Sequence, residues 1–265
     1  MSAGRSTLWH FFVLLFALSV PFWLVGHAVG RLPIPINLPL AALMAGLPAA
    51  IALWLSWKAG GRRQVAALFS RIADVGRVRN AAWLLVAAVL MPAALAAAWG
   101  LQVLTGENLP AIEISPSTLG IFLVLFVAGG IGEELGWQGL VYPLMRARWD
   151  ALTSGLVLGS LWAIWHLVPF LQADRSSEWI LWQSLTMLPL RIITVWLFVN
   201  AGESVAIAIL FHAMCNVAQF SFPAYGSHYE PLTAFIVLGT IAVIIVGACG
   251  NTLMRVQQAE HQPRG

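Results

Sequence analysis

Charged side chains are scarce in this sequence, since Asp, Glu, Lys and Arg together make up 9% of the 265 residues. A soluble domain usually carries about 25% charged residues and about 45 to 50% apolar ones. Here hydrophobic residues reach 60%, and the mean hydropathy is +0.82. This composition excludes a soluble enzyme, a disordered tail and a DNA-binding domain. It predicts an all-α, polytopic membrane protein, with residues 1–265 forming a single integral membrane domain in a lipid bilayer.

Cysteine is almost absent as well. The two cysteines, Cys215 and Cys249, lie within apolar runs, and the sequence has no CxxC pair or Cys/His cluster. This excludes a disulfide framework and a cysteine-based zinc site. Lysine is scarce too: thirteen of the 14 basic residues are arginine, which is typical of a bacterial source. The basic residues behind the net charge of +3 fall in expected loops, so we predict no nucleic-acid partner.

Long apolar runs dominate what is present. A membrane-spanning helix needs about 20 apolar residues, so this length leaves no room for a separate soluble domain. The first run is too long for the apolar part of a signal peptide and lacks a convincing cleavage site, so we expect a retained helix. The runs predict eight spans, at residues 8–29, 38–57, 81–102, 118–145, 151–171, 179–200, 204–222 and 232–253.

Basic residues gather on one side of this arrangement. With eight spans the two termini share a side, and cytoplasmic loops carry an excess of Lys and Arg. We therefore predict that both termini are cytoplasmic and that the protein lies in the inner (plasma) membrane of the cell. Arg31 and Arg175 fall on the opposite side. The basic residues on the side of the termini are Arg5, Lys58, Arg62, Arg63, Arg71, Arg77, Arg79, Arg146, Arg148, Arg255 and Arg264.

The segment 58–80 is the only sizeable basic loop. Its apolar residues Val65, Leu68, Phe69 and Ile72 recur at helical spacing. Basic amphipathic helices lie on anionic lipid headgroups. We predict such a surface helix here.

Five ionisable residues lie inside the expected spans, namely Glu133, Glu134, His166, Arg191 and His212. Each costs about 2.5 to 3.5 kcal/mol at mid-bilayer, so it needs a partner, a cavity or a function. At about 1.5 Å per residue, Glu134, His166, His212 and Asn216 lie roughly 18, 22, 12 and 18 Å from the cytoplasmic ends of their spans. The common depth predicts one polar layer, with a pocket formed by the fourth, fifth and seventh spans.

Spacing within the spans separates the two glutamates. His212 and Asn216 are four residues apart and share a helix face, as do Glu134 and Gln138, whereas Glu133 points about 100° away from Glu134. The two glutamates therefore cannot have the same role. The surrounding glycines favour close helix packing, with space for an extended peptide as the alternative. The aromatic residues Trp137, Trp162 and Trp165 favour packing over the lining of a substrate cavity.

Other intramembrane protease motifs are absent. The sequence has no HExxH or HxxEH for a zinc site and no GxSG for a serine nucleophile. The run from Gly130 to Glu133 is similar to the GxGD of aspartyl proteases, but its acid is glutamate and no second intramembrane aspartate is present.

Three motifs in order resemble those of the CAAX prenyl protease and bacteriocin-processing (CPBP) intramembrane endopeptidases, which are related to type II CAAX prenyl endopeptidases. The family pattern is EExxxR, FxxxH and HxxxN or HxxxD on successive core helices. Here the motifs run from Glu133-Glu134 to Gln138, from Trp162 to His166 and from His212 to Asn216. The resemblance covers about residues 121–220 and implies that residues 118–222 form the catalytic core helices.

Two positions depart from this family pattern. Trp162 replaces Phe, one aromatic residue for another, and we expect little consequence. Gln138 replaces Arg, so the cation that holds the Glu134 carboxylate ionised is missing and only a neutral hydrogen bond remains. Arg191, deep in the sixth span, is the candidate to supply that cation.

The resemblance and the residue types imply an intramembrane peptide hydrolase. Glu133 is then the general base that activates water, oriented by His166. His212 and Asn216 donate hydrogen bonds to the oxyanion. Glu134, Gln138, Arg191 and Trp162 support this set. The implied substrate is a membrane-anchored or hydrophobic peptide.

Three alternatives stay open at this point. Glu133, His166 and His212 are also a plausible zinc ligand set, although we favour a metal-free, glutamic mechanism without a cofactor. Gln138 keeps open a catalytically inactive relative that acts as an immunity or scaffold protein. A proton-coupled transporter is less favoured, because the first three spans contain almost no ionisable residue and no inverted repeat is visible.

Overall fold

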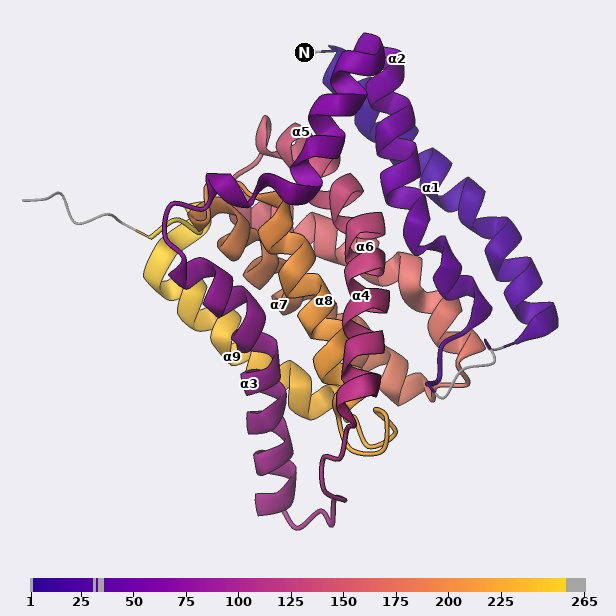
Figure 1. The fold of residues 1–265 in the computed structure, drawn as a ribbon, viewed down its shortest axis with the longest axis vertical. Helices are drawn as coiled ribbons and strands as arrows, with labels where there is room; N and C mark the ends of the chain where they lie inside the picture. Colours follow the sequence, from indigo (N-terminus) through magenta and orange to yellow (C-terminus); the bar gives the residue numbers. More distant parts are fainter. Residues whose placement is uncertain (1, 31, 33–35, 256–265) are drawn as a thin grey trace, which may run out of the picture.

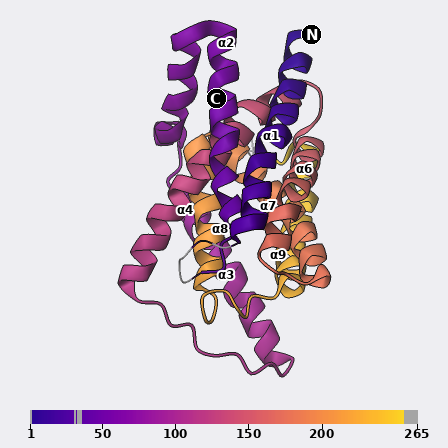
Figure 2. The same ribbon diagram turned by 90° about the vertical axis from the view of Figure 1, so that its right-hand side faces the viewer.

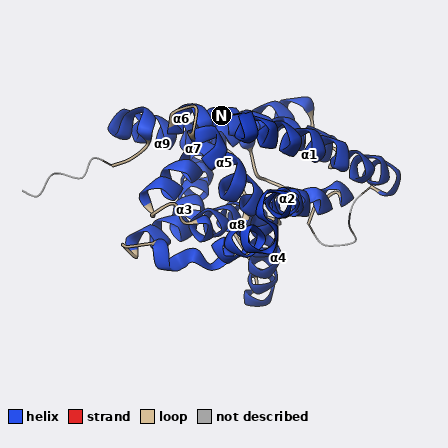
Figure 3. Cartoon of the chain, turned by 90° about the horizontal axis from the view of Figure 1, so that it is seen from above, coloured by secondary structure: helices blue, strands red, loops and turns tan. Residues whose placement is uncertain are grey.

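A computed structural model describes residues 2–30, 32 and 36–255. All regular elements in these residues are helical, which confirms the all-α prediction (Figure 3). The long helices form an elongated bundle (Figure 1). The helices are α1 (Ser2–Val29), η1 (Leu40–Gly46), α2 (Leu47–Phe69), η2 (Ser70–Arg77), α3 (Ala82–Leu104), α4 (Pro116–Gly136), η3 (Trp137–Val141), α5 (Tyr142–Arg146), α6 (Ala151–Gln172), α7 (Ser177–Asn200), α8 (Val205–Ser221), α9 (Pro231–Cys249) and η4 (Gly250–Thr252).

The eight expected spans correspond to eight of these helices or helix groups. Within the described part of the chain, seven are long and apolar enough to cross a membrane. The remaining one, α8, has 17 residues and is apolar but shorter. The protein is therefore an all-α polytopic membrane protein. Arg31 and Arg264, which entered the orientation argument, lie outside the described residues.

The basic segment 58–80 begins with a reversal inside α2. Gly60 and Gly61 have non-helical backbone angles, and φ is +60° at Gly61, a conformation that glycine adopts without steric cost. Figure 2 shows the two arms of α2 running in opposite directions on either side of this reversal. The returning segment is helical as expected, and Leu68 is buried, but Phe69 stays exposed.

Side-chain caps define the starts of the later helices. Ser115, Asp150, Ser176 and Ser204 each accept a hydrogen bond from a backbone N–H in the first turn of α4, α6, α7 and α8, respectively. Glu230 does the same for α9. Such caps satisfy orphan N–H groups, so short polar residues before apolar runs set the helix boundaries.

Glycines in α4 allow close helix packing. A Cβ atom would lie 2.6 Å from the Ala45 carbonyl oxygen at Gly132 and 2.5 Å from the Pro48 carbonyl oxygen at Gly136. Gly129, in contrast, has no atom within 4 Å of such a Cβ. Close packing therefore explains Gly132 and Gly136, while Gly129 borders open space.

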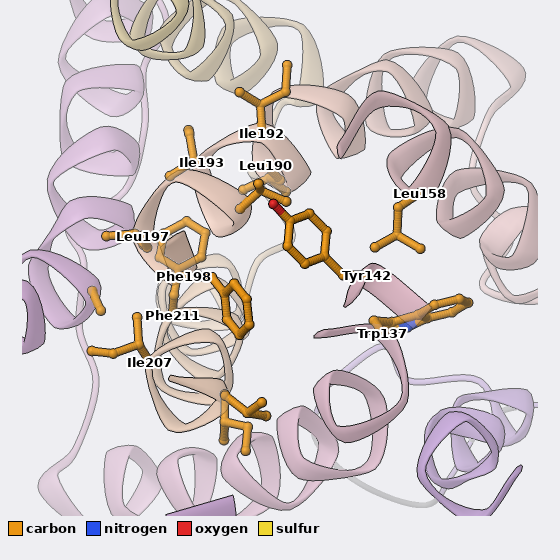
Figure 4. Packing of buried hydrophobic residues seen from close by; sticks show 14 of the residues in the cluster. Trp137, Tyr142, Leu158, Leu190, Ile192, Ile193, Leu197, Phe198, Ile207 and Phe211 are labelled. Atoms are coloured by element: carbon orange, nitrogen blue, oxygen red, sulfur yellow. The ribbon is translucent and has the colours of Figure 1, made fainter. Parts of the chain in front are cut away.

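The core forms where α7 meets its neighbours. The most extensive helix pairings join α6 to α7, α4 to α8, α7 to α9, α2 to α4 and α3 to α8. The residues that follow α4 are packed into this core, where Trp137 and Tyr142 lie among apolar side chains of α6, α7 and α8 (Figure 4). This packing holds α4, α6, α7 and α8 together around the polar residues predicted from the sequence.

Candidate active site

The two adjacent glutamates lie in the last turn of α4. Glu133 is 5% exposed and Glu134 is 1% exposed. Immediately after them the chain forms a π-helical turn, Trp137–Val141, before helix α5. Turns of this kind inside helices are rare and often occur at functional sites.

Glu134 forms a buried ion pair with Arg191 of α7. The Nη1 atom of Arg191 lies 3.0 Å from one carboxylate oxygen of Glu134 and 2.8 Å from the other. Both side chains are 1% exposed. The Nδ1 atom of His212 on α8 lies 2.8 Å from Oε1 of the same carboxylate. Glu134 therefore joins α4 to both α7 and α8, and Arg191 occupies the place expected of the missing cation.

Glu133 is held by tryptophans. The Trp162 indole N–H of α6 donates a hydrogen bond to Oε2 of Glu133 at 2.7 Å, and the Trp137 indole N–H donates to the same oxygen at 3.4 Å. The other oxygen, Oε1, lies 3.8 Å from Nε2 of His212. The two glutamates thus have different partners, as their directions on the helix predicted.

His166 lies on the other side of Trp162. Its Nδ1 atom is 2.9 Å from the backbone carbonyl oxygen of Trp162, one turn earlier on α6. Because a carbonyl oxygen only accepts, Nδ1 carries the hydrogen, and in neutral His166 the Nε2 atom is an acceptor. His166 is close enough to Glu133 and His212 to interact with both electrostatically.

Two predicted residues make fewer contacts than expected. The side-chain amide of Asn216 lies 3.4 Å from the backbone carbonyl oxygen of His212 on its own helix. Gln138 is fully buried in the π-helical turn, and neither of its amide atoms has a hydrogen-bond partner within the described residues. The neutral hydrogen bond expected from Gln138 to Glu134 is therefore not formed, because Glu134 is occupied by Arg191 and His212.

Trp162 makes two contacts that the exchange of one aromatic residue for another did not lead us to expect. A Phe ring at this position has no N–H group, so it cannot make the 2.7 Å hydrogen bond to Glu133. The Trp162 ring also lies under the Arg191 guanidinium, with 4.6 Å between Cζ and the ring centroid. The replacement adds one polar contact and one cation–π contact to the site.

The zinc ligand set that we gave as an alternative is not assembled as a metal-binding group in this structure. Across residues 2–30, 32 and 36–255, no three His, Cys, Asp or Glu side chains form a group that could hold a metal ion. Oε2 of Glu133 accepts from two indoles, Nδ1 of His212 is directed to Glu134, and Nδ1 of His166 is directed to a backbone carbonyl oxygen. A metal ion at this site would therefore have to use Oε1 of Glu133 and the Nε2 atoms of the two histidines.

Sequence reasoning did not identify the contact that fixes the start of α8. The carboxylate of Asp74, in η2, accepts hydrogen bonds from the backbone N–H of Ala206 at 3.0 Å and from the Ser204 hydroxyl at 2.8 Å. Arg71 forms an ion pair with Asp74 at 2.7 Å. The basic loop thus caps the helix that carries His212, a long-range contact without a local sequence pattern.

The fold and this site define a polytopic helical membrane protein with a buried carboxylate and histidine centre. Residues 115–218 match the family model described as type II CAAX prenyl endopeptidase Rce1-like. The match includes all three motifs and Arg191. This part of the chain is similar to that family, which confirms the resemblance seen in the motifs.

A comparison with individual proteins agrees with the family match. The chain is similar to a protein of Methanococcus maripaludis named CAAX prenyl protease 2, with 28% identity over 108 residues. The similarity covers 37% of this chain and 39% of the relative. The chain therefore spans less than half of the relative's length in this comparison, and the similarity concerns the core that carries the site.

Proposed function

We propose that this protein is an intramembrane endopeptidase that hydrolyses a peptide bond with a water molecule activated by Glu133. The observation that carries the proposal is that the two glutamates have different hydrogen-bond partners. Arg191 neutralises Glu134, whereas the hydrogen bonds to Glu133 come from neutral indoles. Glu133 is thus ordered without being paired with an arginine, and its carboxylate can accept a proton from water as a general base does.

In this proposal, Glu133 and His166 together bind and orient the attacking water molecule. Oε1 of Glu133 and Nε2 of neutral His166 are both acceptors, so each can receive one hydrogen of the same water. The oxygen lone pair is then directed away from both, towards a substrate carbonyl. Glu133 takes a proton as the water oxygen bonds to the carbonyl carbon, and it returns this proton to the amine nitrogen when the peptide bond breaks.

In this proposal, His212 donates a hydrogen bond that stabilises the oxyanion. The ionised Glu134 accepts the Nδ1 hydrogen of His212, so only a protonated His212 can also donate from Nε2. In that imidazolium form the Nε2 hydrogen is available to the oxyanion. Asn216, one turn later on α8, adds an amide donor once its side chain rotates away from the His212 carbonyl oxygen.

The substrate we propose is a membrane-anchored or hydrophobic peptide. The site lies among apolar helices, and Gly129, one turn before Glu133, borders open space. The name of the M. maripaludis relative refers to CAAX prenyl substrates. For this chain we propose the broader class, with cleavage in the plasma membrane and with residues 118–222 as the catalytic core. The glutamic mechanism is preferred because neither the activation of water by Glu133 nor the stabilisation of the oxyanion by His212 and Asn216 requires a metal ion.

The test is cleavage of a membrane-anchored peptide library by the purified protein in proteoliposomes. Glu133→Gln, His166→Ala and His212→Ala should each abolish cleavage while the protein still inserts and folds. Asn216→Ala should retain activity about 10² to 10³ times lower than wild type, the usual cost of one oxyanion donor. Glu178→Gln, at the exposed start of α7, is the matched control and should behave as wild type.

Each alternative has its own outcome in this experiment. A folded wild-type protein that cleaves no peptide supports the inactive immunity or scaffold relative. Loss of activity on chelation, with recovery on adding zinc, supports the metal-dependent mechanism. Proton uptake without cleavage supports the transporter. Cleavage that survives in Glu133→Gln would refute the general-base role.

A further inference from the structure

The Trp162 side chain contacts each charged or titratable group of the site except Glu134. Its N–H donates to Glu133 at 2.7 Å, and its face lies 4.6 Å from Cζ of Arg191. The ring centroids of His166 and His212 lie 5.2 Å and 5.7 Å from that of Trp162. Trp162 therefore does more than fill space in the core. It donates to the Glu133 carboxylate, and its ring faces Arg191, the cation that pairs with Glu134.

The chemistry of the indole distinguishes the two oxygens of Glu133. An indole N–H only donates, and of the two oxygens of a carboxyl group the one without a hydrogen is the better acceptor. Trp162 and Trp137 both donate to Oε2. A proton on Oε2 would weaken these two hydrogen bonds, whereas a proton on Oε1 leaves them intact. The two tryptophans therefore favour Oε1, the oxygen 3.8 Å from Nε2 of His212, for proton transfer.

We propose that Trp162 is a positioning residue that orients the Glu133 carboxylate so that Oε1 accepts the proton of the attacking water. This inference rests on the proposed function. Trp162 also links the two halves of the site, because the same ring that holds Glu133 contacts the Arg191 guanidinium paired with Glu134.

The two departures from the family motifs meet at this ring. The chain has Gln138 where the pattern has Arg, and its cation comes from α7 as Arg191. It has Trp162 where the pattern has Phe, and the larger ring covers that cation. Tryptophan is the best aromatic partner for a guanidinium. Trp162 and Arg191 thus act together as a substitute for the cation at the usual position.

The first test is the Trp162→Phe variant, which keeps an aromatic ring and removes the N–H donor. We expect kcat to fall about tenfold with KM unchanged, because a hydrogen bond to a charged group is lost without a change in substrate contacts. Trp196→Phe is the matched control. Trp196 is also a tryptophan in the bundle, packed against Trp83, and its indole nitrogen has no hydrogen-bond partner among the described residues, so kcat should not change.

The second test does not depend on activity. In protein labelled with ¹⁵N at the indoles, the Trp162→Phe and Trp196→Phe spectra identify the two N–H resonances. Glu133→Gln should move the Trp162 resonance upfield, because the carboxylate acceptor becomes a neutral amide, and should leave the Trp196 resonance in place.

The outcomes separate this inference from the proposed function. A Trp162 resonance that stays in place in Glu133→Gln, or a Trp162→Phe variant with wild-type kcat, overturns the positioning role alone. A folded wild-type protein that cleaves no peptide overturns the proposed function and the positioning role together, even if the resonance moves as expected. A moved resonance with a fall in kcat supports both.

Discussion

At the scale of single residues, the buried pair of Arg191 and Glu134 is the central electrostatic feature. Neither charge is accessible to water, since each side chain is 1% exposed. Burying two ions is costly, and the cost is offset only by good geometry and further hydrogen bonds. Here one guanidinium nitrogen contacts both carboxylate oxygens, and His212 adds a third contact. The pair therefore depends on both partners being present.

Arg191→Leu should destabilise the protein by about 3 to 5 kcal/mol, because it leaves the Glu134 carboxylate buried without a cation. Thermal unfolding in detergent measures this loss, and the peptide assay should show inactivation. The double variant Arg191→Leu with Glu134→Gln is the control: it removes both charges, so its stability should recover in part, but its activity should not.

Adding Gln138→Arg to Arg191→Leu should restore function, because it places a cation four residues after Glu134, as in the family motif. The fully buried Gln138 has no hydrogen-bond partner to lose within the described part of the chain. An Arg191→Leu protein with unchanged stability and activity would contradict the role of the ion pair.

At the scale of secondary-structure elements, the end of α4 is fixed by close backbone contacts. Gly132 and Gly136 lie on one helix face and approach the carbonyl oxygens of Ala45 and Pro48. This contact holds the turn that carries Glu133 and Glu134 against η1 and the start of α2. The geometry of the site therefore depends on residues that make no contact with substrate.

Gly136→Ala should destabilise the protein by about 1 to 3 kcal/mol, the usual cost of overpacking a tight contact. The added methyl group would lie 2.5 Å from the Pro48 carbonyl oxygen, a backbone atom that cannot rotate away. Gly129→Ala, on the same helix but facing open space, is the matched control. Alanine favours helix over glycine, so this control should be neutral or slightly stabilising by thermal unfolding. Equal effects of the two substitutions would refute the packing explanation.

At the scale of the whole molecule, the tip of α2 and the loop between α3 and α4 lie at opposite ends of the bundle (Figure 1). The tip belongs to the basic segment 58–80, whereas the loop 105–115 contains no Lys or Arg. This asymmetry is the basis for the proposed orientation in the membrane.

Single cysteines in a background without Cys215 and Cys249 can test this orientation in intact cells. A membrane-impermeant maleimide should label Glu113→Cys and should not label Arg63→Cys until the cells are opened. Labelling of Arg63→Cys alone in intact cells would show that the protein has the opposite orientation, with its termini outside.

The sequence alone predicts the apolar helices and the polar layer within them. Hydrophobic runs, N-terminal caps such as Ser115 and Asp150, and the helical rise are local properties, so the eight spans and the shared depth of Glu134, His166 and His212 follow from them. The hydrogen bond between Trp137 and Glu133 joins residues at i, i+4 spacing, so it too has a local signal in the sequence.

Only the tertiary structure decided which of these residues are partners. Glu134 pairs with Arg191 across 57 residues of chain, and Glu133 accepts from Trp162 across 29. Such contacts depend on how each helix is rotated and how closely the helices approach. Glycines at the helix interfaces and the long-range cap of α8 by Asp74 control both. Local patterns carry no information on these rotations. For that reason the sequence could place a tryptophan beside the site, but only the fold showed that its N–H holds the proposed base.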